Sequence, residues 1–175
     1  MTRTALLLLN FQKDFYSGGK YPINGVQSAG KAAGILLQCF RDHGGLHIHT
    51  QIETRDGSRP YCVPSTEGIR IHDDVAHYEG EPIIHTDRWN AFTSHELDSM
   101  LQVNQITRLL ICGSNSQAIE ETVKAGIELG YSIWVCKDAC PVNTPSFQEL
   151  KNCEEWNVEF VITKLSAERY LSNHL

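Results

Sequence analysis

Residues 5–15 read ALLLLNFQKDF, which is five apolar residues followed by an asparagine and a mostly polar stretch. A short and continuous apolar run of this kind is typical of a strand that is buried on both faces of a parallel sheet. Five further segments have the length and composition of strands. The predicted strands are Ala5–Leu9, Leu46–Gln51, Pro82–His85, Arg108–Cys112, Ile133–Cys136 and Val158–Thr163.

Segments of helical length separate these strands. Thr93 and Glu96 are three residues apart, as in a capping box, and predict a helix that begins at Thr93. The predicted helices are Val26–Phe40, Thr93–Val103, Ala118–Leu129, Ser146–Glu155 and Ala167–Leu171. Strands that alternate with helices favour an α/β fold, here a three-layer sandwich around a mainly parallel sheet of five or six strands. We expect residues 1–175 to form a single domain.

Composition excludes several classes of protein. The net charge is -6 and no run of Lys and Arg occurs, so we expect no nucleic-acid partner. The apolar run at 5–9 is too short for a signal peptide, and no segment is long enough for a membrane helix, so we predict a cytoplasmic protein without a membrane partner. The six cysteines include no Cys-x-x-Cys motif and are expected to be reduced thiols rather than zinc ligands.

Three segments, taken in order, resemble the isochorismatase-like cysteine hydrolase superfamily, which includes nicotinamidases and N-carbamoyl amidases. Leu6–Phe15 is similar to the family's apolar strand followed by Asp-hydrophobic-Gln-x-Asp-Phe. Arg88–Leu101 resembles its Lys-x-x-aromatic-Ser-Ala-Phe segment and the helix start that follows. Leu109–Gly113, Ala118–Tyr131 and Asp138-Ala139 resemble its nucleophile strand, turn and helix. The resemblance implies an isochorismatase-like fold and a homo-oligomer of two or more chains.

The family's chemistry uses a Cys nucleophile at a helix start, an Asp base and an orienting Lys. At the matching positions this chain has Asn10 for the Asp and Thr86 for the Lys. The Cys position falls on Ala118, or on Ile119 if the turn is one residue shorter. None of these side chains is a thiol, and an Asn amide does not titrate. The resemblance therefore implies a degenerate triad and no thiol mechanism.

No cofactor or metal is predicted. Nicotinamidases carry an Asp-x-His-x-x-His pattern after the second strand, whereas this chain has Gln51–Thr54 there. A small-molecule ligand is predicted at the carboxyl ends of the strands, where ligands bind in sheets of this type. The predicted ligand-binding residues are Asn10, Phe15, His85, Thr86, Trp89, Asn115, Ala118 and Ile119.

Two roles are open for several of these residues. Asn10 either forms hydrogen bonds with backbone groups at the end of a strand or binds a ligand. His85 forms a pair with Asp87 for acid–base work or is a structural residue. Asp14 is expected to support the local loop. The aromatic residues Phe11, Phe15, Trp89 and Phe92 either gather around the mouth of the pocket or belong to the core. Phe92 is expected in the core, and Trp89 is expected at the pocket or in a subunit contact. Cys62 and Cys112 are expected to be inert thiols.

Three hypotheses for function follow. The first is a catalytically degenerate family member that binds a small molecule or a partner protein. The second is a hydrolase of a small amide or vinyl ether that uses His85, Asp87 or Asp14 to activate water. The third is a structural subunit that assembles with an active paralogue. The long loop at Glu53–Gly68 either closes over the site or builds an oligomer contact.

Overall fold

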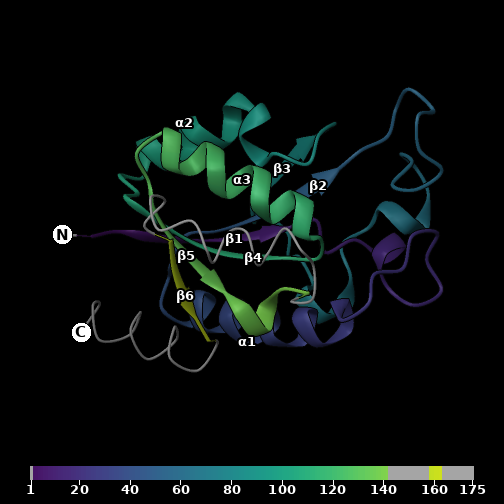
Figure 1. Cartoon of the computed structure of the whole chain (residues 1–175). Coiled ribbons are helices and arrows are strands. Elements are labelled where there is room, and N and C mark those ends of the chain that lie inside the picture. The colour runs from purple at the N-terminus through teal and green to yellow at the C-terminus, as the bar shows by residue number, and fades with distance from the viewer. Residues whose placement is uncertain (1, 142–157, 163–175) are drawn as a thin grey trace.

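The computed structural model describes residues 2–141 and 158–162, which form six strands and three α-helices (Figure 1). The strands are β1 (Thr4–Leu9), β2 (His47–Ile52), β3 (Ile83–Thr86), β4 (Arg108–Gly113), β5 (Ser132–Cys136) and β6 (Val158–Val161). The helices are α1 (Val26–Asp42), α2 (His95–Val103) and α3 (Ser116–Glu128). The helices predicted at Ser146–Glu155 and Ala167–Leu171 lie outside the described residues.

All six strands are parallel and lie in the order β3-β2-β1-β4-β5-β6. β1 is therefore an inner strand, and Leu7 lies between Ile48 of β2 and Ile111 of β4. This position explains why β1 is apolar at almost every residue, since both of its faces are covered. The predicted α/β fold with a parallel sheet of five or six strands is confirmed.

The sheet is the middle layer of three (Figure 1). On one face, Leu6 and Leu8 pack with apolar residues of α1. On the other face, Leu7 and Leu9 pack with apolar residues of α2 and α3. Within the described residues, no helix is long and apolar enough to cross a bilayer.

Two helices begin at residues other than those predicted. The N-cap of α2 is Ser94, and the Thr93 hydroxyl instead donates to the Asn90 carbonyl oxygen at 2.8 Å. The capping-box prediction was therefore wrong, because residues 91–93 form a separate 3-10 turn. α3 begins two residues before the predicted Ala118, because the Asn115 side chain caps it by accepting from the backbone N–H of Gln117.

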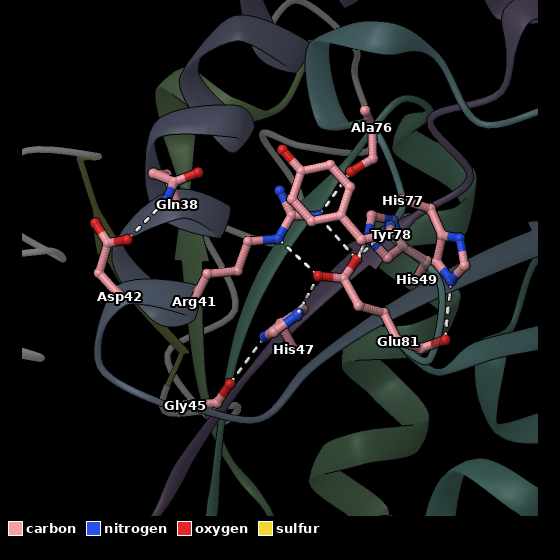
Figure 2. A network of polar contacts seen from close by, with 10 residues as sticks. All are labelled: Gln38, Arg41, Asp42, Gly45, His47, His49, Ala76, His77, Tyr78 and Glu81. Atoms are coloured by element: carbon pink, nitrogen blue, oxygen red, sulfur yellow. Dashed lines mark hydrogen bonds and ion pairs between the residues drawn. The ribbon is translucent and has the colours of Figure 1, made fainter.

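A polar network joins α1 to the edge of the sheet (Figure 2). Arg41 Nε and Nη2 donate to the two carboxylate oxygens of Glu81, each at 2.7 Å. His47 Nε2 lies 3.0 Å from the same carboxylate, and His49 Nε2 lies 3.8 Å from it. The Tyr78 ring covers the Arg41 guanidinium at 3.8 Å. Glu81 thus links α1, β2 and the segment that leads into β3.

Gly113→Ala is expected to destabilise the fold by about 2 kcal/mol, because it overpacks the junction between β4 and α3. A methyl group at position 113 would lie 2.7 Å from Ile119 Cγ1 and 3.2 Å from Leu9 Cβ. Urea unfolding of the wild type and the variant measures the difference. In an Ile119→Ala background the same substitution should cost much less, because Cγ1 is then absent. An equal cost in both backgrounds would contradict this packing argument.

Candidate functional site

Asn10 follows β1 at the carboxyl end of the sheet, where all the parallel strands end. Its backbone has a φ of 53°, in the left-handed region that Asn tolerates better than most residues. Its backbone N–H donates to Thr50 Oγ1 at 3.1 Å, and the Thr50 hydroxyl donates to Asn10 Oδ1 at 2.8 Å. The Ser114 hydroxyl donates to the Asn10 carbonyl oxygen. Asn10 therefore ties β1 to β2 and to the end of β4, and its side chain is buried.

Ala118 and Ile119 lie in the first turn of α3 and are fully buried. Both belong to the apolar cluster between the sheet and the helices α2 and α3. The backbone N–H of Ala118 points to the side-chain oxygen of Asn115 at 3.3 Å. The position expected to carry a nucleophile thus carries a buried methyl group, and Asn115 acts as a helix cap.

Thr86 and His85 lie on opposite faces of β3, because side chains alternate along a strand. The Thr86 hydroxyl donates to the Arg88 carbonyl oxygen at 2.8 Å. His85 Nδ1 lies 2.9 Å from Glu53 Oε1. The predicted pairing of His85 with Asp87 is corrected to Glu53, since β3 ends at Thr86 and the backbone N–H of Glu53 bonds the Thr86 carbonyl oxygen at 2.7 Å.

An aromatic group surrounds the fully buried ring of Phe15. The rings of Tyr61 and Trp89 each lie 5.9 Å from it, and the Arg59 guanidinium lies 5.6 Å from the Trp89 ring. Phe92 lies elsewhere and stacks on Tyr131 at 5.8 Å. The expectation that Phe92 is a packing residue is confirmed. Tyr61, which was not among the predicted aromatic residues, packs against Phe15 instead.

Two neighbouring pockets lie at the carboxyl end of the sheet. The Trp89 pocket, of about 650 Å³, is lined by Trp89, Arg59, Arg88, Gln117 and others. The His85 pocket, of about 270 Å³, is lined by His85, Thr86, Thr93 and Ser94, among others. Both pockets are lined by Glu53, Arg55 and Asp87, so they lie side by side and together make up the cleft.

The structure places seven of the eight predicted ligand-binding residues in two groups, and the eighth, Asn115, caps α3. Trp89, His85 and Thr86 line the cleft. Phe15, Asn10, Ala118 and Ile119 are buried and at most 1% exposed. Among the residues that the structure describes, no cluster of three or more His, Cys, Asp or Glu side chains could hold a metal ion.

Asp14 and the nearby thiols are part of the scaffold. Asp14 Oδ2 accepts from the backbone N–H of Cys62 at 2.6 Å, and its Oδ1 accepts from that of Lys20 at 3.1 Å. This arrangement confirms the predicted structural role of Asp14. Burial raises the pKa of the Cys62 thiol to about 12 and raises that of Cys112 well above its ordinary value.

The sequence matches the isochorismatase domain family over residues 4–155. The chain belongs to the isochorismatase family. An isochorismatase family protein of Bacillus subtilis (strain 168), YddQ, is 33% identical over 147 residues, which is 83% of this chain and 82% of the relative. The nicotinamidase of Escherichia coli (strain K12) is 24% identical over 180 residues, covering 80% and 84% of the two chains.

A crystal structure of an isochorismatase family protein from Desulfovibrio vulgaris superposes with a TM-score of 0.87. It covers 98% of this chain and 100% of its own, at 22% identity, and so supports the isochorismatase fold.

Sequence reasoning missed Glu53, Arg59 and Tyr61 as residues of the cleft or its aromatic wall. The ligand-binding residues predicted at the strand ends include none after the second strand. The same rule at that strand points to Glu53, which follows β2 directly. Arg59 and Tyr61 lie in the long loop, which carries no periodic pattern that could orient them.

Proposed function

We propose that this isochorismatase family member has lost the Asp–Lys–Cys triad and binds a small molecule in the cleft at the carboxyl edge of its sheet. The observation that carries the proposal is Ala118, a fully buried methyl group at the start of α3 where the family's thiol is expected. Asn10 and Thr86 add to it, since both are engaged in hydrogen bonds within the fold.

The other described thiols near the site are poor substitutes for the missing nucleophile. A thiol attacks as the thiolate, so a raised pKa lowers its reactive fraction at neutral pH. Burial raises the pKa of Cys62 to about 12, and it also raises the pKa of Cys140, which lies beyond β5. Neither thiol is exposed to a substrate.

The Trp89 pocket supports a flat ligand with polar groups. Its wall combines Trp89 with the guanidinium of Arg59, and aromatic and cationic surfaces of this kind suit a flat ligand that carries an anionic or carbonyl group. Glu53, Asp56 and Asp87 line the same pocket and offer acceptors for hydroxyl or amide donors.

The test combines turnover with binding. We expect no product from nicotinamide, isochorismate or N-carbamoylsarcosine, but at least one of them should raise the melting temperature of the protein. Trp89→Ala should abolish that shift, whereas Leu129→Ala, at an exposed position beyond α3, should keep it. Turnover of any of the three compounds that disappears in Trp89→Ala would contradict the proposal.

A further inference from the structure

Glu53 lies against the His85 ring beside the cleft. His85 Nδ1 is 2.9 Å from Glu53 Oε1, which is the distance of an ion pair, and the negative carboxylate favours a ring proton on Nδ1 over one on Nε2. The other oxygen of Glu53 accepts from Arg55 Nε at 2.7 Å, and its backbone bonds Thr86. The Glu53 side chain is only 12% exposed, whereas that of His85 is 52% exposed. A fixed carboxylate thus supports an accessible imidazole.

The His85 pocket gives Nε2 a place to act. Within the described part of the chain, neither Nε2 of His85 nor the hydroxyl of Ser94 has a hydrogen-bond partner. Ser94 is the N-cap of α2 and lines the pocket. The pocket therefore places an imidazole and a hydroxyl around a space of about 270 Å³.

The same arrangement does not occur at His47, which also contacts a carboxylate. His47 Nδ1 is engaged with the Gly45 carbonyl oxygen at 2.8 Å, and its Nε2 is engaged with Glu81 at 3.0 Å. Neither ring nitrogen of His47 is left to accept a proton from a substrate. His85 combines a carboxylate on one nitrogen with a pocket at the other.

We propose that the Glu53–His85 pair is a general base that activates water for the hydrolysis of a small ester. His85 Nε2 takes a proton from water while the water oxygen attacks the ester carbonyl carbon. The ester C–O bond then breaks, and the leaving alkoxide takes the proton from the imidazolium, which yields a carboxylic acid and an alcohol.

His85 is the catalytic residue of this step, and Glu53 is a positioning residue. The step uses none of Asn10, Thr86 and Ala118, so it is independent of the degenerate triad. An ester suits the site better than an amide, because an alkoxide leaves with less assistance from an acid than an amine does.

The test measures hydrolysis of p-nitrophenyl acetate by the full chain, with free imidazole at the same concentration as the background. His85→Asn is expected to lower kcat/KM by about 100-fold. His43→Asn should leave the rate unchanged, because His43 is exposed and does not line the His85 pocket. A general-base step should also be slower in D2O. The proposal is overturned if His85→Asn stays within twofold of the wild type, or if His43→Asn loses as much.

Glu53 and Ser94 separate positioning from covalent catalysis. Glu53→Leu should lower kcat by roughly tenfold with little change in KM, and Glu53→Gln should retain more of the rate because its side-chain oxygen still attracts a proton on Nδ1. Equal rates in the two Glu53 variants would remove the positioning role. Ser94→Ala should be as active as the wild type. If Ser94→Ala instead loses both its activity and an initial burst of product, the nucleophile is the Ser94 hydroxyl rather than water. Ligand binding in the Trp89 pocket should survive His85→Asn. A failure of the ester-hydrolysis proposal therefore does not contradict the proposed function.

Discussion

Arg41→Ala is expected to lower the free energy of unfolding by about 3 kcal/mol and the melting temperature by about 10 °C. Arg41 and Glu81 are 14% and 12% exposed, and they share two hydrogen bonds of 2.7 Å (Figure 2). Removing the guanidinium leaves a largely buried carboxylate with weaker partners, and an uncompensated charge is costly to bury. Arg41 Nη2 also donates to the Ala76 carbonyl oxygen at 2.7 Å, which loses its partner as well.

Denaturant unfolding measures this effect, with Lys31→Ala as the matched control on an exposed face of the same helix. That control should change stability by less than about 0.5 kcal/mol. The double variant Arg41→Ala/Glu81→Gln should recover part of the loss, because the buried charge is then absent. If the double variant is as unstable as the sum of the two single variants, the charge pair is not the cause.

The parts of the fold that follow local rules could be predicted from the sequence. β1 and β4 were placed to within one residue, because strands buried on both faces are apolar throughout. The end of α3 was predicted to within one residue, and the Gly130 that follows has a φ of 88°, which Gly adopts readily. The start of α3 was misplaced because Asn115 was not considered as a cap.

The site was harder to predict because its contacts join distant segments. His85 and Glu53 are separated by a long loop, and only the strand order brings them together. The same holds for Arg41 and Glu81, which are 40 residues apart, and for Glu81 and His47, which are 34 apart. Local sequence patterns do not show that such distant residues are neighbours, so each resembles an ordinary surface charge. The partner of His85 was therefore taken to be the near neighbour Asp87.

Acidification from pH 7 to pH 5 is expected to lower the free energy of unfolding by about 2 kcal/mol through His49 alone. Burial lowers the pKa of His49 to about 3, despite the opposing charge of Glu81, so the folded protein keeps this ring neutral. The unfolded chain protonates it with an ordinary pKa near 6.5. Between these two values the unfolded state binds more protons, so stability is highest above pH 6.5 and falls as the pH decreases.

Glu81 adds a second loss at lower pH in the same direction. Burial alone would raise its pKa, but hydrogen bonds from Arg41, the Tyr78 backbone and His47 outweigh burial and lower the pKa to about 2. The stability that Glu81 contributes is therefore lost only as the pH falls from about 4.5 toward 2. Urea unfolding at half-unit intervals should thus show an early decline due to His49 and a later one due to Glu81. His49→Leu should flatten the decline in stability between pH 7 and 5, whereas the exposed control His43→Gln should keep it. An unchanged slope in His49→Leu would show that other groups cause the acid sensitivity.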